Sequence, residues 1–270
     1  MPELPEVEAV CRRIAPAILG AEIAAAKVVR PRIARPQRPS AIERKLSQRR
    51  VEAVARRAKH ILIHLDGGLT LVVHLGMTGN LFVVPDARFR PVATRFYATL
   101  SDGRGLLLED SRMFGKVSLY PSAGLGERLP PLGPEPLDPA FTPEVLAALA
   151  SRTRQPAKLF LMDQRRVAGL GNIYAAEALF EAKIDPRTAT NRLGLTRIRR
   201  LHAAIVGVLD SAVQSCVLAY ATPGRFVEGE AYPVAVYGRE GEPCRTCGAR
   251  IRRIEQGARS TYFCPRCQKR

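Results

Sequence analysis

Tryptophan is absent from this chain of 270 residues, and aromatic residues make up only 6% of it. The sequence also lacks any apolar run that approaches the roughly 20 residues of a membrane-spanning helix. Three glutamates lie among the first eight residues, whereas a secretory signal peptide begins with basic residues. These absences argue against a membrane protein and a secreted one. They predict a soluble, cytoplasmic protein.

Acidic residues are scarce relative to basic ones. The chain has 42 Lys and Arg against 25 Asp and Glu, which gives a net charge of +17. Most of the surplus is arginine, whose planar guanidinium matches the geometry of phosphate. A polyanionic partner is therefore predicted, with nucleic acid as the first candidate. The alternative is a basic surface of the kind that a high-GC genome produces, and composition does not separate DNA, RNA and anionic membrane.

Four of the six cysteines form one pattern near the carboxyl end, Cys244-x2-Cys247 and Cys264-x2-Cys267, with sixteen residues between the pairs. Each pair can place two thiolates on one turn, and two such turns complete a tetrahedral zinc site. Because four ligands close the site, the zinc is predicted to be structural. An iron–sulfur site and redox thiols are the alternatives.

The segments 250–254 and 260–263 both lie between the two cysteine pairs. Their residue pattern predicts the two strands of a hairpin. Residues 239–270 hold nine Lys and Arg against three acids. The hairpin is therefore predicted to contact nucleic acid, and Arg259 is the best candidate for a phosphate ligand. The two remaining cysteines, Cys11 and Cys216, lie in apolar helical patterns and are predicted to be core thiols without a further role.

The apolar periodicity changes along the chain. Residues 5–18 have helical spacing. Short apolar runs separated by turn signals then predict many strands, which favours a β-sandwich or barrel-like domain. These runs are 24–29, 51–55, 61–65, 69–75, 81–84, 96–100, 106–108 and 117–120.

Residues 121–143 contain seven prolines and three glycines, which predicts an extended linker. Beyond the linker the spacing becomes helical, and residues 217–238 read as a long irregular loop. The predicted helices are 144–150, 157–163, 172–182 and 196–215. The fold class is therefore α+β and multidomain, with divisions at 1–130, 131–238 and 239–270.

Pro2 follows the initiator methionine, and bacterial-type processing usually removes Met before a small residue. The resulting secondary amine would be a nucleophile, because α-amines titrate near about 8 and are partly neutral at physiological pH. Glu3, Glu6 and Glu8 are close enough in sequence to move protons. The alternative is that Pro2 only marks a helix entrance, with acidic residues complementing the helix dipole.

Three further segments carry candidate site residues. Gly169-Leu170-Gly171-Asn172 lies between two predicted helices, where free backbone N–H groups could bind phosphate. His74–Gly79 and Asp110–Gly115 are turns that could expose Met77, Arg112 and Phe114, side chains able to wedge into a duplex. Taken alone, these turns favour ordinary core positions for Met77 and Phe114. Lys59 could hold a phosphate or be solvated.

Together these motifs resemble the formamidopyrimidine-DNA glycosylase family, which includes the endonuclease VIII group. The matching segments span the chain, and Pro2-Glu3-Leu4-Pro5-Glu6 is similar to the formamidopyrimidine branch. They are 1–8, 57–59, 74–79, 110–115, 169–180, 236–247 and 259–269. The resemblance implies a catalytic N-terminal β-sandwich domain with an N-terminal helix, a helix-two-turn-helix DNA-binding domain, and a zinc-finger β-hairpin.

The implied activity is that of a bifunctional DNA glycosylase/AP lyase of base excision repair. Pro2 would attack C1′ of an 8-oxoguanine or formamidopyrimidine nucleotide as a Schiff-base nucleophile. Glu3 would protonate the sugar ring oxygen, and β,δ-elimination would cleave the strand. The implied setting is a bacterial cytoplasm with nucleoid association, one structural Zn²⁺, damaged double-stranded DNA as partner, and a monomeric state.

The resemblance also implies roles for the other candidates. Lys59 belongs to the catalytic group and grips a phosphate. Met77, Arg112 and Phe114 fill the gap left by the extruded nucleotide. The remaining DNA contacts are His74, Asn172 and Arg259, and Glu6 and Glu177 match acidic positions near the site.

The sequence departs from the family pattern in two places. A Gly-Gly-Thr-Thr-like stretch is usual where this chain reads Gln214-Ser215-Cys216-Val217-Leu218, and the loop 220–234 also differs. Position 113 is Met where Arg is usual. The first departure bears on lesion preference, so an endonuclease VIII-like enzyme for oxidised pyrimidines is one alternative. A non-catalytic zinc protein that binds damaged DNA is the other.

Overall fold

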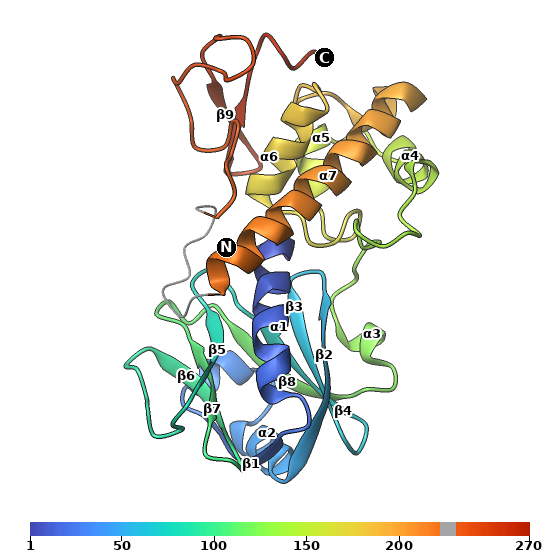
Figure 1. The fold of residues 1–270 in the computed structure, drawn as a ribbon. Helices are drawn as coiled ribbons and strands as arrows, with labels where there is room; N and C mark the ends of the chain where they lie inside the picture. Colours follow the sequence, from blue (N-terminus) through green and yellow to red (C-terminus); the bar gives the residue numbers. More distant parts are fainter. Residues whose placement is uncertain (222–230) are drawn as a thin grey trace. The chain divides into compact units, whose positions relative to one another are not determined.

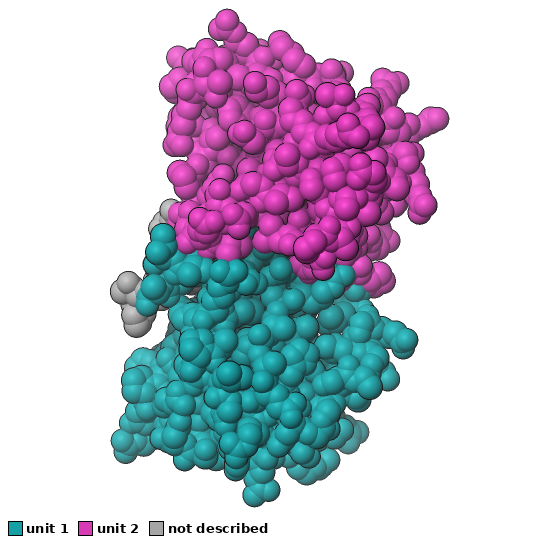
Figure 2. All heavy atoms as spheres, turned by 45° about the vertical axis from the view of Figure 1, so that its right-hand side comes forward, with its two compact units in different colours: residues 1–130, 216–228 teal, residues 131–215, 229–270 magenta. Residues whose placement is uncertain are grey.

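The computed structural model describes residues 1–221 and 231–270. The chain forms two compact units, coloured separately in Figure 2. Unit 1 comprises Met1–Pro130 and Cys216–Glu228, and unit 2 comprises Pro131–Ser215 and Gly229–Arg270. The α+β fold class is confirmed. The three-part division into domains stays a prediction.

Unit 1 is built on antiparallel strands in two halves, β5-β7-β6-β1 and β2-β3-β4-β8. Only two residue pairs, Glu22 with Arg50 and Ile23 with Arg49, join β1 to β2 between the halves. Each strand covers one of the predicted apolar runs. The strands are β1 (Glu22–Val28), β2 (Arg49–Arg57), β3 (His60–Leu65), β4 (Leu69–His74), β5 (Asn80–Val84), β6 (Thr94–Leu100), β7 (Gly105–Glu109) and β8 (Lys116–Pro121).

Helix α1 (Leu4–Ile18) lies along the strands of unit 1, as Figure 1 shows. Its apolar stripe of Val7, Val10, Ile14 and Ile18 is buried in the core between α1 and the sheet, which confirms the predicted helix. Burial of four such side chains contributes about 1.5–3 kcal/mol each to the stability of the unit. This burial holds α1 against the sheet of unit 1.

Two short helical segments between β1 and β2 were not predicted. They are η1 (Pro31–Ala34) and α2 (Pro39–Leu46), in a stretch rich in proline and arginine. Only Ile42 and Leu46 of α2 are buried, so its apolar pattern is too short to stand out in the sequence. The proline-rich segment is likewise not wholly extended, because it contains one helical turn, α3 (Leu125–Arg128).

Unit 2 consists of helices and a terminal hairpin. The Thr142 hydroxyl accepts a hydrogen bond from the Val145 N–H and so caps the first helix of this unit. The elements are α4 (Pro143–Ser151), α5 (Ala157–Met162), α6 (Asn172–Glu181), η2 (Thr190–Arg192), α7 (Leu195–Tyr220), β9 (Arg252–Gln256) and β10 (Arg259–Phe263), and the residues of α7 from Cys216 on belong to unit 1. Helix α7 continues to Tyr220, so the expectation of a loop from residue 217 is wrong for residues 217–220. The rest of that loop includes 222–230, which lie outside the described residues.

Among the described residues, α7 is the one helix long and apolar enough to cross a membrane, with a mean hydropathy of 1.6 over its most apolar window. Its buried side chains include Ile198, Leu201, Ile205 and Leu209. Burial of one stripe is typical of a core helix in a globular protein. Such a helix can have the length and the composition of a membrane-spanning helix.

Candidate active site

The amino-terminal segment is held by reciprocal hydrogen bonds at the entrance of α1. Glu3 is the N-cap residue, and its backbone N–H donates to Glu6 Oε2 over 2.9 Å. The Glu3 carboxylate in turn accepts the backbone N–H of Glu6, which completes a capping box. Both glutamates are buried. This is the geometry of a helix entrance, and it also fixes the position of Pro2, whose nitrogen is an amide while Met1 is attached.

Lys59 follows the tight turn between β2 and β3, where Ala58 adopts a φ of 52°. Its side chain is buried, with 5% of the residue exposed, so the solvated alternative is wrong. A buried ammonium group needs a partner for its charge, because burial of an unpaired charge costs free energy. A solvated lysine at the surface does not have this cost.

His74 ends β4 as a neutral imidazole. Its Nδ1 accepts the Gly76 N–H over 3.0 Å, which leaves Nε2 as the protonated nitrogen and hence a donor. Burial, together with the nearby His60 and Lys59, lowers the pKa of His74 to about 4. The two histidine rings lie 5.1 Å apart. At neutral pH the His74 side chain can therefore donate one hydrogen bond to an anion without carrying charge.

Two loops of unit 1 pack together through Asp110, which is fully buried. One carboxylate oxygen accepts the Thr78 hydroxyl at 2.6 Å and the Arg112 N–H at 3.2 Å. The other accepts the Gly115 N–H at 2.6 Å. Sequence reasoning quoted Asp110 as part of the loop without giving it a role. The acidic residue at the start of a glycine-containing turn was the signal.

The side chains that these loops present are exposed. Met77 is 40% exposed and Phe114 is 42% exposed, so the interpretation of both as core residues is wrong. The Arg112 guanidinium lies 5.0 Å from the centre of the Phe114 ring. Because the backbone beneath is fixed by Asp110, these three side chains form an apolar and cationic tip on a rigid base.

Gly76 allows the close approach of the two loops. An added Cβ would lie 2.5 Å from the carbonyl carbon of Phe114, and Gly76 has a φ of +65°. We expect Gly76→Ala to lower the free energy of unfolding by about 1–3 kcal/mol more than Gly68→Ala does. Gly68 is the matched control, since its φ is +67° and an added Cβ meets nothing within 4 Å. Urea unfolding of both variants measures the difference, and equal losses would contradict the packing argument.

In unit 2, the turn before α6 is held by the side chain of Gln164. Its amide nitrogen donates to the carbonyl of Leu170 at 2.7 Å, and its oxygen accepts the N–H of Gly169 at 2.9 Å. Gly169 has a φ of +87°, a region that favours glycine. The predicted tight turn thus places Asn172 as the first residue of α6.

The Asn172 side chain is only partly satisfied. Its Nδ2 lies 3.5 Å from the hydroxyl of Tyr237, and its Oδ1 is buried without a hydrogen-bond partner among the described residues. Exchanging the amide oxygen and nitrogen would let Tyr237 donate to Oδ1, and would leave the amide N–H groups for an anion. The Lys158 ammonium donates to the Asn172 carbonyl at 2.9 Å. Sequence reasoning missed both Lys158 and Tyr237, because an apolar helix and an irregular loop gave no signal.

Glu177 anchors the chain that follows the loop. Its carboxylate accepts backbone N–H groups from Ala235, Val236 and Tyr237 at 2.6, 3.0 and 2.8 Å. Burial raises the pKa of Glu177, and these hydrogen bonds partly oppose that shift. The carboxylate therefore positions Tyr237, which in turn contacts Asn172. In this structure the Glu177 carboxylate therefore binds backbone N–H groups of its own unit.

The four cysteines of the predicted metal site come together in unit 2, with all sulfur atoms within 4.8 Å of one another. Cys244 and Cys267 are 3.9 Å apart, and Cys247 and Cys264 are 3.5 Å apart. Tetrahedral zinc with bonds of about 2.3 Å requires sulfur separations of about 3.8 Å. The residues therefore fit one structural zinc ion.

Arg259 begins β10 beside the two-residue turn Gly257-Ala258, in which both residues have positive φ. This is the geometry of a tight hairpin. The Arg259 side chain is exposed and has no hydrogen-bond or ion-pair partner in the part of the chain that the structure describes. It is thus available to an external anion.

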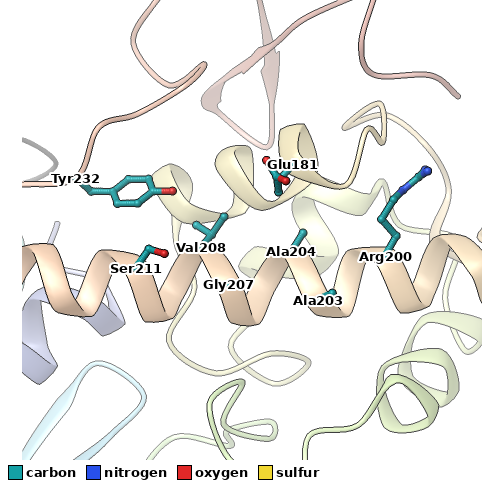
Figure 3. Close-up of a pocket in the computed structure, with 8 residues that line it drawn as sticks. All are labelled: Glu181, Arg200, Ala203, Ala204, Gly207, Val208, Ser211 and Tyr232. Carbon is teal, nitrogen blue, oxygen red and sulfur yellow. The ribbon is translucent and has the colours of Figure 1, made fainter. Parts of the chain in front are cut away.

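A pocket of about 450 Å³ opens along α7 in unit 2, where small residues and Arg200 of that helix face the side chains of Glu181 and Tyr232 (Figure 3). None of the residues singled out from the sequence lines it. The candidate residues of unit 1 lie at the α1 entrance and on the two loops, and those of unit 2 lie at the α6 entrance, in the segment 235–237 and on the hairpin.

Family models match three parts of the chain. They describe a formamidopyrimidine-DNA glycosylase N-terminal domain at residues 1–117, the H2TH domain of the same enzyme at 132–219, and a zinc finger found in FPG and IleRS at 241–270. The formamidopyrimidine-DNA glycosylase of Chloroflexus aggregans is 44% identical, over 99% of this chain and 98% of its own length. That of Xanthomonas oryzae pv. oryzae is 40% identical over the full length of both.

Solved structures agree with the curated relatives. The Lactococcus lactis enzyme bound non-covalently to DNA with an AP site is 30% identical, with a TM-score of 0.88 over 99% of this chain and 100% of that one. The same enzyme in complex with DNA containing FAPY-dG is 29% identical, with a TM-score of 0.90 over the same shares.

Proposed function

Because this chain belongs to the formamidopyrimidine-DNA glycosylase family, we propose that it excises oxidised purines from double-stranded DNA and then cleaves the strand at the abasic site. It is a bacterial-type DNA repair enzyme of the cytoplasm, with one structural zinc ion. The observation that carries the proposal is the buried Glu3–Glu6 capping box, which fixes Pro2 at the start of a rigid helix. Association with the nucleoid follows from DNA binding.

The reaction begins once Met1 has been removed. The neutral Pro2 amine attacks C1′, the bond between C1′ and the base breaks, and the base leaves with a proton. Glu3 protonates the sugar ring oxygen as the ring opens. The product is an iminium. It stays cationic because the nitrogen of an iminium formed from a secondary amine carries no proton that it could lose.

That cation withdraws electrons from C2′ and makes its proton acidic. Loss of this proton breaks the bond between C3′ and its phosphate oxygen, which is β-elimination. A second loss breaks the corresponding bond at C5′, which is δ-elimination. Water then hydrolyses the imine and frees Pro2, and the strand is left with a one-nucleotide gap.

The other residues bind and bend the substrate. His74 and Lys59 hold phosphate from unit 1, and Asn172 and Arg259 hold phosphate from unit 2. Met77, Arg112 and Phe114 enter the stack and replace the extruded nucleotide, a role for which their exposure on a fixed base suits them. Glu6 and Glu177 act on the protein rather than on the DNA.

Lesion preference is tested with a panel of duplexes. We expect cleavage at 8-oxoguanine and formamidopyrimidine to exceed cleavage at thymine glycol and 5-hydroxycytosine by about tenfold or more, because tenfold needs only about 1.4 kcal/mol of differential transition-state binding. The FAPY-dG complex of a relative supports the purine preference. Faster cleavage of the pyrimidine lesions would identify an endonuclease VIII-like enzyme. Binding without cleavage of any duplex would identify a protein that only binds damaged DNA.

A further inference from the structure

Cys216 lies where this sequence departs from the family's Gly-Gly-Thr-Thr-like stretch, and the structure gives its thiol a specific partner. The residue is fully buried on the last turns of α7, within unit 1. Its Sγ lies 3.9 Å from Glu6 Oε1, a contact between residues 210 positions apart in the sequence. The core location predicted for this cysteine is confirmed, but the thiol packs against a carboxylate as well as against apolar side chains.

The contact adds a donor to the Glu6 carboxylate. Its Oε2 accepts the Glu3 N–H, and the Cys216 thiol donates to its Oε1. Only 1% of Glu6 is exposed, so its carboxylate has little access to water. A thiol is a weak donor, but a buried carboxylate oxygen that loses a donor loses stabilisation of its charge.

Other titratable groups border this pair. Tyr220 follows Cys216 by one helical turn, and burial raises the pKa of its phenol, as do Cys216 and Glu6. Arg13, whose pKa is lowered by burial, lies near Tyr220. Tyr220 is thus a neutral neighbour at physiological pH. Glu3 approaches from the same helix entrance.

We propose that Cys216 is a positioning residue for the lyase reaction, because its S–H donates to the Glu6 carboxylate and holds it toward the backbone of Glu3. That backbone sets where the Pro2 nitrogen lies. The inference rests on the proposed function, since the position of Pro2 matters for activity only if its amine reacts. The thiol takes no part in a covalent step.

The test compares Cys216→Ala with Cys216→Ser in single-turnover cleavage of abasic-site DNA between pH 5 and pH 8. Removing the donor is expected to raise the pKa of Glu6. The acid limb, which is the part of the curve of cleavage rate against pH that rises from low pH, then moves to higher pH in Cys216→Ala. We expect a shift of about 0.5 pH unit, which is roughly a threefold loss of rate on that limb. Serine keeps a donor, so Cys216→Ser is expected to retain the wild-type limb. Cys11→Ala is the matched control, because that buried thiol donates to the Ala55 carbonyl instead.

Three results would overturn the inference: an unshifted limb in Cys216→Ala, an equal shift in the serine variant, or the same shift in the Cys11 control. A second measurement needs no activity. Carbon-13 NMR of glutamate carboxyls in the DNA-free protein should show a higher Glu6 pKa in Cys216→Ala than in the wild type. If wild-type protein forms no reducible adduct with DNA, the proposed function fails, while this titration still decides whether the thiol acts on Glu6.

Discussion

Pro2→Gly is expected to lower the yield of borohydride-trapped protein–DNA complex by about tenfold or more. Wild-type protein should form this complex with DNA that contains 8-oxoguanine or an abasic site, because borohydride reduces the iminium to a stable amine. Glycine supplies a primary amine without the ring that fixes the direction of the nitrogen, so a residual yield is expected. Gel electrophoresis of the trapped complex measures the yield, and mass spectrometry of the intact protein reports whether Met1 has been removed.

The matched control is Pro39→Gly. Pro39 is the first residue of α2, so the change affects a helix entrance in the same unit but no candidate nucleophile. We expect it to trap as well as the wild type. Unchanged trapping by Pro2→Gly would assign the nucleophile to another amine, such as a lysine. A wild-type protein that cleaves abasic-site DNA and is never trapped would rule out the imine altogether.

Cys264→Ala is expected to release the zinc ion and to weaken DNA binding by about a hundredfold or more. The finger shares a small apolar cluster with α6, and two of the five buried members, Cys244 and Cys264, are themselves metal ligands. Binding of structural zinc contributes about 10–16 kcal/mol in zinc-finger peptides, more than a cluster of this size supplies. Without the metal, the hairpin that carries Arg259 loses its fixed geometry.

Zinc content is measured by atomic emission, and affinity by fluorescence anisotropy with an abasic-site duplex. Hydrogen exchange in the strands of unit 1 should stay at the wild-type level, because that core is separate from the finger. Cys11→Ala removes a buried thiol from unit 1 and should retain both zinc and DNA binding. Retention of zinc by Cys264→Ala, or wild-type affinity after its loss, would show that the finger does not act as described.

The arrangement of strands and longer helices could be predicted because burial leaves a periodic trace. All eight strands of unit 1 cover an apolar run with turn signals around it, and α1 has its stripe of valine and isoleucine. The unpredicted α2 buries only Ile42 and Leu46, which is too little signal. The end of α7 was misplaced, because residues 217–220 contain no turn former and the helix continues through them.

The candidate site was found in part. Pro2, the zinc cysteines and the glycine turn before Asn172 follow from residue type and spacing. The exposure of Met77 and Phe114 does not, because an apolar residue in a turn is as consistent with a core as with a tip. Their exposure depends on Asp110 and Gly76, which bring two loops together from different parts of the chain.

The amino-acid sequence by itself determined the chemistry available to this protein. It contains a proline directly after the initiator methionine, four cysteines with the spacing of a metal site, and a surplus of arginine. Each of these depends on residue type and on short spacings. Only the tertiary structure decided that Cys216 meets Glu6, that Glu177 holds the backbone of 235–237 and that His74 is neutral. Those outcomes depend on burial and on contacts between distant residues, and pKa and hydrogen bonding respond to such contacts rather than to sequence neighbours.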